Sequence, residues 1–567
     1  MKLQISRRKS LLGAVLVVAL AGGTWGLMSV LSGPPRAPFV PGEAVARRLS
    51  PEQYRTIIAD VFGPEIQLGG RFEPDLRIDG LLAVGSGEVS VTPAGMEQYD
   101  VMAETIAAQV TDESRRDLLI PCRPAAENGP DDACAQQFLG KVGRLLFRRP
   151  LTNDELTAYV GAAGAAGKML GSFYRGLSMS LAAMLESPQF LFREATIEPD
   201  PDKPGEYRLD AYAKASRLSF FLWNTSPDPQ LLDAAESGEL HTRRGLKKQV
   251  DRMIESPRLE ASVRAFFSDM FGFDGFETLA KDATIYPYFS AQVVEDAGEQ
   301  TLRTIVDLLV RERSDYRSIF TTRKTFMTQA LASVYAVPLP HDGFNGSPDM
   351  WQRYEFPEGD PRAGILAQVS FVALHSPPGR GSATLRGKAL REIMLCQKVP
   401  PPPPGVMFEL VEDTTNPKYK TARERLAAHN QNPGCAGCHK IMDPIGFSFE
   451  NFDGSGAYRT AENGVTIDSS GELDGVPFTD ARGLGEAMRG NRATSSCLVD
   501  RITAYALGRT ASKGEREWLT DLKEEFADEG YVLPALMQEI AMSEEFYRVA
   551  APDQDTAAAE VVARVAE

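Results

Sequence analysis

Helix-start signals recur along the whole chain, and they restrict it to a mainly α-helical fold. The segment Ser50–Gln53 combines a serine cap, a proline at the first helical position and a glutamine that completes a capping box. Thr152–Glu155 repeats the arrangement with threonine and glutamate. Apolar residues then follow at helical spacing, for example Leu218 and Leu222 after Asp210. The chain of 567 residues is long enough for several such helical domains.

Strand signals are scarce by comparison. The best is Val465–Ile467, which precedes the turn residues Ser469–Gly471 and then Leu473. This pattern predicts one small β-hairpin. The fold class expected from the sequence is therefore a mainly α, multi-module helical protein with a single small hairpin.

The N-terminus has the layout of a secretory signal. Basic residues at positions 7–9 precede an apolar run over residues 11–20. Ala19–Ala21 offers a cleavage site made of small residues, but weak hydrophobicity continues to residue 31, and about 20 residues suffice to span a membrane. A cleaved signal and a retained membrane anchor both fit this segment. In either case we expect the body of the protein in the periplasm or cell envelope.

The charge balance and the motif content exclude several functions. Lys and Arg total 61 against 77 Asp and Glu, so the net charge is −16, and no basic arm offers itself to a nucleic acid. Only the N-terminal stretch is apolar enough to enter a bilayer, which excludes a polytopic membrane protein. The chain contains no phosphate loop, Gly-x-Ser-x-Gly or His-Glu-x-x-His motif. The sequence therefore assigns no catalytic residues.

Six cysteines in an exported chain favour disulfide pairing. Cys122 and Cys134 flank a polar loop, which predicts a short local disulfide. Cys396 and Cys497 would then form a long-range disulfide across the C-terminal third. The alternative is that these four remain free, buried thiols, which behave as small hydrophobes. The other two cysteines belong to a motif of their own.

That motif, Cys435–His439, reads C-x-x-C-H. Thiols at this spacing can form thioether bonds with the two vinyl groups on one edge of a haem, and the histidine that follows can ligate the iron. The sequence therefore predicts one covalently bound haem c. Cys435 and Cys438 are its expected attachment residues, and His439 is the expected proximal iron ligand.

Three other interpretations fit the same residues. A thioredoxin-like redox pair would require a preceding strand, whereas Asn432–Gly434 is a turn sequence. Half a zinc site, with His429 as a further ligand, would place the adjacent Cys438 and His439 awkwardly on one tetrahedral ion, and the chain lacks a second such pair of cysteines. The third interpretation is a chance match combined with a structural disulfide.

The second axial position of the iron has several candidates. A methionine or histidine there gives an electron carrier, whereas an open position permits ligand or peroxide chemistry. His429 and Met488 are the distal candidates, with His375 as a third, and each has a plainer interpretation as a surface or core residue. Met442 follows the proximal histidine too closely to reach across the ring. Asp443–Gly446 is expected to turn the chain after the ligand.

Five segments of the chain, taken in order, resemble a known family. They are residues 48–54, 147–152, 215–223, 426–453 around the C-x-x-C-H motif, and 497–509. The order is similar to that of large planctomycete-type secreted proteins built from the domains of unknown function DUF1587, DUF1595, DUF1592, DUF1588 and DUF1585. The resemblance implies a helical, exported, haem-bearing protein with an embedded cytochrome-c-like haem module, and His429 fits the family pattern as well. Larger members carry a further N-terminal C-x-x-C-H that this chain lacks, so the resemblance implies one haem.

The expected modules follow from this resemblance and from the Pro- and Gly-rich boundaries. They are a signal peptide or anchor (1–33), a first helical module with an irregular loop (34–94), a helical module with Cys122 and Cys134 (95–168), a large helical module (169–338), the haem module (339–475), a C-terminal helical module (476–552) and a tail (553–567).

The leading hypothesis for function is an exported c-type cytochrome that transfers electrons to or from a periplasmic redox protein or dehydrogenase. One alternative is a haem-dependent oxidoreductase or peroxidase-like enzyme, with its substrate held by residues 171–338. Another is a non-catalytic surface or polymer-binding protein whose haem is structural. Electron transfer ranks first because a single haem suffices for it.

Overall fold

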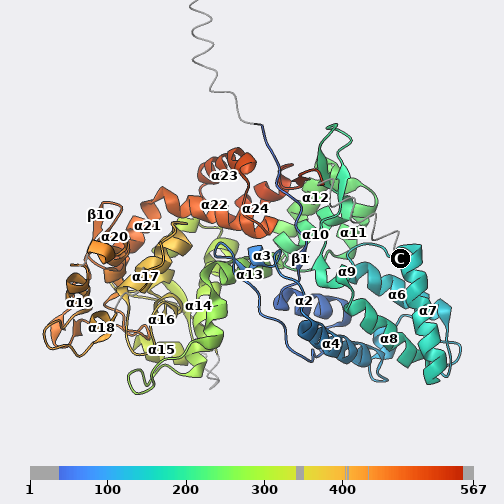
Figure 1. Cartoon of the computed structure of the whole chain (residues 1–567), viewed down its shortest axis with the longest axis horizontal. Coiled ribbons are helices and arrows are strands. Elements are labelled where there is room, and N and C mark those ends of the chain that lie inside the picture. The colour runs from blue at the N-terminus through green and yellow to red at the C-terminus, as the bar shows by residue number, and fades with distance from the viewer. Residues whose placement is uncertain (1–37, 340–349, 403, 405–407, 432, 553–567) are drawn as a thin grey trace, which may run out of the picture.

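The computed structural model describes residues 38–552 apart from 340–349, 403, 405–407 and 432 (Figure 1). The expected signal or anchor segment 1–33 and the tail 553–567 lie outside these residues. Helices make up most of the described chain, as the sequence predicts, and strands occur there only as short pairings. Within the same residues, no helix combines the length and the apolarity needed to cross a membrane.

The first third of the chain is helical. Its elements are β1 (Arg47–Arg48), α2 (Pro51–Phe62), α3 (Leu82–Gly85), α4 (Pro93–Thr111), α5 (Arg116–Leu119), α6 (Asp132–Leu146), α7 (Asn153–Leu170), α8 (Phe173–Leu185), α9 (Pro188–Leu191) and β2 (Phe192–Arg193). Both predicted capping boxes are present, since the side chains of Ser50 and Thr152 accept hydrogen bonds from the amides of Gln53 and Glu155. Local polar contacts therefore fix where α2 and α7 begin.

The middle of the chain alternates longer helices with short segments. Its elements are β3 (Ile197–Pro199), β4 (Tyr207–Leu209), α10 (Ala211–Leu222), α11 (Pro229–Glu236), η1 (Glu239–His241), α12 (Arg243–Ile254), α13 (Leu259–Phe271), η2 (Phe273–Thr278), α14 (Ala291–Ile305), η3 (Val306–Arg311), η4 (Tyr316–Phe320), β5 (Lys324–Met327), α15 (Gln329–Tyr335) and β6 (Gln352–Glu355). The side chain of Asp210 caps α10 by accepting from the Ala213 amide.

The last part contains the C-x-x-C-H segment. Its elements are η5 (Ile365–Ala367), α16 (Val369–Leu374), α17 (Ala383–Ala389), η6 (Leu390–Met394), α18 (Glu409–Glu412), α19 (Ala422–His429), α20 (Pro433–Gly446), η7 (Phe447–Phe449), β7 (Ala461–Glu462), β8 (Val465–Thr466), β9 (Gly471–Leu473), β10 (Val476–Phe478), α21 (Ala481–Gly490), α22 (Arg492–Leu507), η8 (Lys513–Glu515), α23 (Arg516–Asp528), α24 (Leu533–Met542) and β11 (Arg548–Val549).

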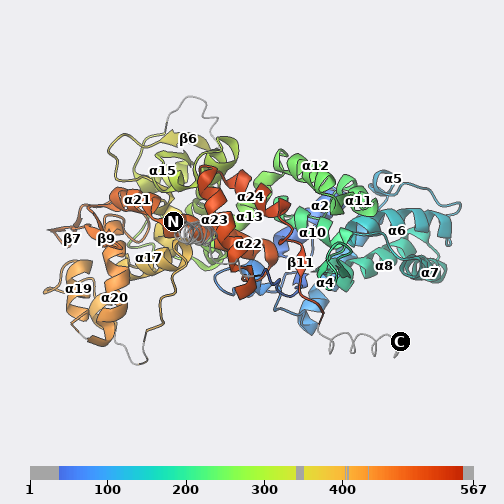
Figure 2. The ribbon, with the colours of Figure 1, turned by 90° about the horizontal axis from the view of Figure 1, so that it is seen from above.

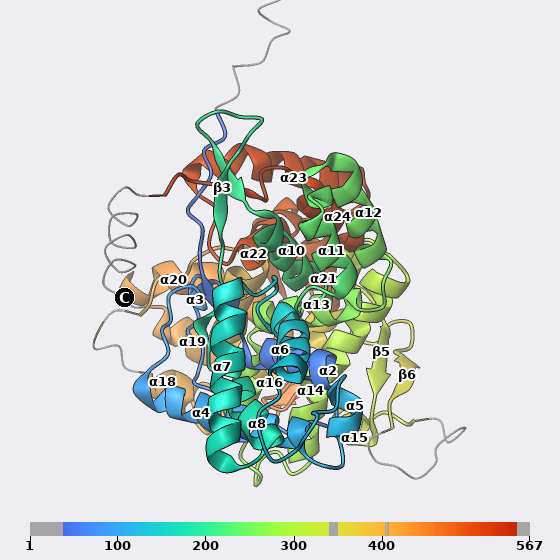
Figure 3. The ribbon, with the colours of Figure 1, turned by 90° about the vertical axis from the view of Figure 1, so that its right-hand side faces the viewer.

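The elements form an elongated body. Helices α17 to α20 lie toward one end of its long axis, and α6, α7 and α8 lie at the other (Figures 1 and 2). Seen along that axis, α6, α7 and α8 stand in front of the rest of the molecule (Figure 3). The C-terminal helices α22 and α24 return to the middle, where β11 pairs with β4. The C-x-x-C-H segment therefore sits near one end of the molecule.

The strands correct one detail of the sequence interpretation. The predicted single hairpin is two hairpins, because β8 pairs with β7 and β9 pairs with β10. Each closes on a two-residue turn with positive φ at both positions, Asn463-Gly464 in the first and Asp474-Gly475 in the second. Turns of this composition match the twist of the flanking strands, so strands of only two or three residues can pair locally. The pairings β1–β2, β5–β6 and β3–β4–β11 add further strands that the sequence did not indicate.

The buried residues form one large core and several smaller ones. The largest extends from α10 and α13 to α22 and α24, and it includes Phe449 from the segment after α20. A second core lies beneath α2, α4, α6 and α8. Beside α20 is a small cluster of Ala383, Leu426 and Phe447, with Val411 packed against it. The surroundings of the C-x-x-C-H segment thus bury few apolar side chains of their own.

Both predicted disulfides are present. Cys122 and Cys134 close a short loop, and Cys396 pairs with Cys497 of α22 across a sequence separation of 101 residues. The second bond ties the segment that leads to the C-x-x-C-H helix to the C-terminal helices.

Candidate functional site

Helix α20 presents the C-x-x-C-H residues in its first two turns. Cys435 and Cys438 are three positions apart, so they lie on one face of the helix. Both are half-buried free thiols. Cys435 and Cys438 therefore do not form the structural disulfide that one interpretation of the motif required. Both thiols are available for covalent chemistry.

His439 is held by a carboxylate one turn further along the same helix. Its Nδ1 atom lies 2.9 Å from Oδ2 of Asp443, and the side chains are only 13% and 3% exposed. Asp443 also accepts hydrogen bonds from Thr384 Oγ1 of α17 at 2.8 Å and from Asn430 Nδ2 after α19 at 3.2 Å. A carboxylate accepts, so Nδ1 is the nitrogen that donates and Nε2 is the nitrogen left to bind a metal. This is the tautomer that a metal-binding histidine requires.

The role of Asp443 differs from the sequence expectation. We expected Asp443–Gly446 to turn the chain, but α20 continues through Asp443 and Pro444 to Gly446. Pro444 costs the helix a single backbone hydrogen bond near its end, and Asp443 gains its contact with His439 only if the helix continues. The missed signal was the spacing of four residues between a histidine and an aspartate.

His429, the last residue of α19, lies against His439. The two imidazole centroids are 5.1 Å apart in an edge-to-face arrangement. The Nε2 atom of His429 is buried and has no hydrogen-bond partner among the residues that the structure describes. Burial lowers the pKa of His429, and the neighbouring His439 lowers it further, against a smaller opposing effect of Asp443. A neutral ring with a free nitrogen therefore stands beside the expected proximal ligand.

The other candidates for the distal position lie elsewhere. Met488 of α21 is fully buried in the largest core beside Leu484. Met442 is buried in α20. His375 packs edge-on against Phe371, and burial lowers its pKa to about 4. Of the histidines and methionines predicted for this position, the structure brings His429 into ring contact with His439.

Two glycines allow the backbones of α20 and α17 to pack closely against each other. A Cβ atom on Gly446 would lie 1.8 Å from the carbonyl oxygen of Ala383, and one on Gly387 would lie 2.1 Å from that of Met442. Real side chains never approach so closely, so only glycine permits the two backbones to meet. The close approach places Thr384 within reach of Asp443 and so orients His439.

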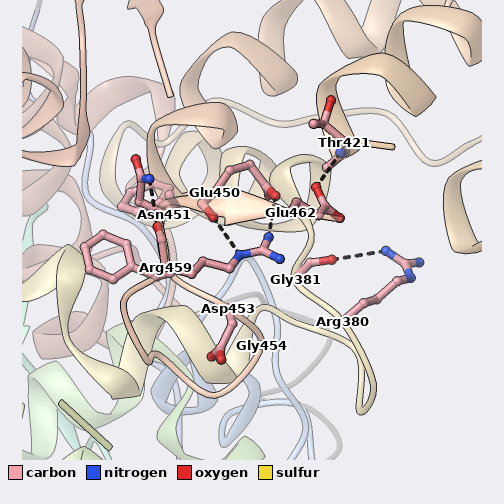
Figure 4. Close-up of polar contacts among 12 residues, drawn as sticks. Arg380, Gly381, Thr421, Glu450, Asn451, Asp453, Gly454, Arg459 and Glu462 are labelled. Carbon is pink, nitrogen blue, oxygen red and sulfur yellow. Dashed lines mark hydrogen bonds and ion pairs between the residues drawn. The ribbon is translucent and has the colours of Figure 1, made fainter. Parts of the chain in front are cut away.

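A buried polar network fixes the chain that leaves α20. The fully buried Arg386 of α17 donates to the carbonyl oxygens of Phe449 and Phe452, each at 2.8 Å. Arg459 reaches Glu450, with Nη2 3.1 Å from Oε2 (Figure 4). Burial raises the pKa of Glu450, which Arg386 and Arg459 partly oppose. These contacts hold the segment that follows α20 in a fixed position.

The cysteine and histidine side chains at α20 suit covalent haem attachment better than they suit a preformed metal-ion site. Within the described parts of the chain, no three His, Cys, Asp or Glu side chains lie close enough together to hold a metal ion. Two half-buried thiols on one helix face and two adjacent imidazoles are instead the residues that covalent haem attachment and axial ligation use.

Family models match the chain over five successive segments. They are described as proteins of unknown function: DUF1587 at residues 47–112, DUF1595 at 134–194, DUF1592 at 209–337, DUF1588 at 362–462 and DUF1585 at 474–546. All five expected domains are therefore present in the expected order. They define a multi-domain helical protein, and the chain belongs to the planctomycete-type family that combines these domains.

The candidate site falls within one of these domains. Cys435, Cys438, His439, His429 and Asp443 all lie in the DUF1588 segment. The comparison with curated proteins found no match, and neither did the comparison with solved structures.

Proposed function

We propose that this chain is an exported c-type cytochrome with one covalent haem, and that it transfers electrons to or from a periplasmic redox protein or dehydrogenase. The observation that carries the proposal is the contact of His439 with Asp443 directly after two free thiols at the C-x-x-C spacing. Cys435 and Cys438 would anchor the porphyrin, and Nε2 of His439 would ligate the iron. A bound haem would supply a one-electron couple between ferrous and ferric iron.

The surroundings of the thiols support a porphyrin at this place. Leu385 of α17, Ile441 of α20 and Phe408, which lies before α18, are large apolar residues with more than a third of their surface exposed. The ring of Phe408 stacks on His429, with centroids 6.5 Å apart. The cluster of Ala383, Leu426 and Phe447 is small. A covalently held porphyrin would cover exposed apolar surface and add to this core, which is a common way to stabilise a small domain.

The position of His429 favours electron transfer over haem enzymology. Its Nε2 atom is buried without a partner, and a buried polar atom is expected to have one. Iron ligation would satisfy it. Two histidine ligands would leave no open position on the iron. A filled position suits an electron carrier, whereas a haem oxidoreductase needs an open position for its substrate or oxidant.

The proposal is tested by expressing the full chain with a haem-maturation system and measuring the pyridine haemochrome spectrum. We expect one covalent haem per chain, retained after denaturation and acid–acetone extraction. The matched variant replaces Cys435 and Cys438 with serine and should bind none covalently. A wild-type protein without covalent haem under these conditions would contradict the proposal.

A further inference from the structure

A second site lies in the middle of the molecule, away from the domain that carries the cysteines. A pocket of about 700 Å³ opens where β1, β2, α2, α10, α13 and the end of α22 meet. Its walls come from the DUF1587, DUF1595, DUF1592 and DUF1585 segments, and none of its lining residues belongs to the DUF1588 segment. The pocket therefore exists only when four domains assemble.

Arg193 lines this pocket and is 92% buried by protein, since only 8% of its surface is exposed. Its guanidinium lies 4.5 Å from the ring centroid of Phe220. Its Nε atom has no hydrogen-bond partner, and no carboxylate of the described chain forms an ion pair with it. Burial lowers its pKa to about 10, which still leaves it charged at neutral pH. Burying a charge without a partner costs considerable free energy.

The neighbours of Arg193 increase this cost. Arg47 is its direct partner across the β1–β2 pairing, and like charges placed opposite one another are destabilising. The charge of Arg47 has a structural explanation, because it donates at 3.0 and 3.1 Å to the carbonyl oxygens of Tyr505 and Ala506 at the C-terminal end of α22. Among the described residues Arg193 donates no such hydrogen bond and pairs with no carboxylate, so its charge faces the ring of Phe220 but no anionic group.

Five carboxylates line the pocket, and among the described residues none of them forms an ion pair with Arg193: Glu52, Asp75, Asp269, Asp274 and Glu277. Asp274 pairs with Arg77. Asp75 pairs with Arg48 at 2.9 Å, and Asp269 pairs with Arg77 at 3.0 Å while also accepting from the amides of α3. They therefore do not neutralise Arg193.

We propose that this pocket binds a ring-bearing organic carboxylate, with Arg193 as the residue that holds its anionic group. A guanidinium offers two parallel donors that match the two oxygens of a carboxylate. Phe72, Phe220 and Phe273 line the same pocket, and the half-buried ring of Phe72 offers apolar surface to the body of the ligand. The site stands apart from the proposed haem function, so failure of haem attachment has no bearing on it.

Benzoate is a suitable probe, and benzamide is its uncharged counterpart of the same shape. Calorimetric titration of the full chain should show one benzoate site and no comparable binding of benzamide. Arg193→Met should weaken benzoate binding about tenfold or more, as expected for the loss of a charge-assisted hydrogen bond. Equal binding of benzoate and benzamide, or unchanged benzoate binding in Arg193→Met, would overturn the proposal, as would no benzoate binding to the wild type.

The thermal stability of the ligand-free variant separates a binding role from a structural one. Arg193→Met removes an uncompensated buried charge, so its melting temperature should equal or exceed that of the wild type. Arg148→Met is the matched control, because Arg148 is equally buried but donates to several carbonyl oxygens, including that of Leu146 at 2.9 Å. The control should lose stability. A similar loss in Arg193→Met would assign Arg193 a structural role and contradict the proposed site.

Discussion

The Nδ1 atom of His439 lies 2.9 Å from Oδ2 of Asp443, and the carboxylate is held from two other parts of the chain by Thr384 and Asn430. This contact decides which imidazole nitrogen is free, and it also raises the basicity of a ligating ring. A more basic ligand stabilises ferric over ferrous iron. The proposed cytochrome should therefore have a lower reduction potential than it would with a neutral partner at position 443.

Asp443→Asn is accordingly expected to raise the reduction potential while covalent attachment continues. The shift should be roughly 60 mV for each tenfold change in the preference for ferric iron. A spectroelectrochemical titration measures it. Thr384→Val is the control, because it removes one hydrogen bond to Asp443 but leaves the contact with His439. An unchanged potential in Asp443→Asn would show that the carboxylate does not tune the ligand.

His429→Ala should change the coordination of the iron. If His429 is the second axial ligand, its removal converts a six-coordinate, low-spin haem into one that binds carbon monoxide or cyanide without displacing a protein ligand. The absorption spectrum before and after ligand addition reports this. Met488→Leu is the control, because Met488 is packed in the core and its replacement conserves volume. Loss of the low-spin spectrum in Met488→Leu instead would assign the position to Met488.

Gly446→Ala should destabilise the haem-free protein by about 1–3 kcal/mol, the usual cost of forcing extra atoms into a packed site. The new Cβ would lie 1.8 Å from the carbonyl oxygen of Ala383, so α20 must move away from α17. Denaturant unfolding measures the change. Gly437→Ala in the same helix is the control, since its Cβ would meet nothing within 4 Å, and it should be neutral or stabilising. Equal stability of the two variants would be evidence against the close helix contact.

The two disulfides should differ in their contribution to stability. The chain-entropy argument gives about 4.7 kcal/mol for a loop of about 100 residues and about 3 kcal/mol for one of about 15 residues. Replacing both Cys396 and Cys497 with serine should therefore cost more than the same change at Cys122 and Cys134, whose sequence separation is 12 against 101. Chemical denaturation of the two double variants compares them. The reverse order would show that strain or local packing, and not loop length, sets the contribution.

Glu450 should make stability depend on pH. Burial raises its pKa in the folded state above the ordinary value of 4.5, so above that value the folded chain holds a proton that the unfolded chain has released. The free energy of unfolding should then fall as the pH rises from 4.5 through the raised pKa. Below pH 4.5 this carboxyl is protonated in both states, so its contribution should no longer depend on pH. Glu450→Gln should flatten this part of the curve of unfolding free energy against pH. An unchanged curve would show that Arg386, together with Arg459, which contacts Glu450 in Figure 4, fully offsets the effect of burial on this pKa.

Much of the local structure could be predicted from the sequence. The capping boxes at Ser50 and Thr152 and both disulfides are present as expected. The capping boxes depend on residues three positions apart, and the Cys122–Cys134 disulfide depends on thiols flanking a short loop. The pairing of Cys396 with Cys497 follows once the other four cysteines are assigned. The Asn-Gly and Asp-Gly turns could have revealed both hairpins, but the strands they join are only two or three residues long. Pro444 led us to expect a turn at a point where α20 in fact continues. The contact of Asp443 with His439 was therefore not predicted, because it requires a continuous helix between the two residues.

By itself, the sequence determined the mainly helical fold, the paired cysteines, the C-x-x-C-H spacing and the family to which the chain belongs. Only the tertiary structure decided that His429 would lie against His439, that Thr384 would reach Asp443, and that Arg193 would be buried opposite Arg47 in a pocket made by four domains. The reason is physical. Capping and helical periodicity act over a single turn, whereas these contacts join residues that meet only when distant apolar surfaces pack together.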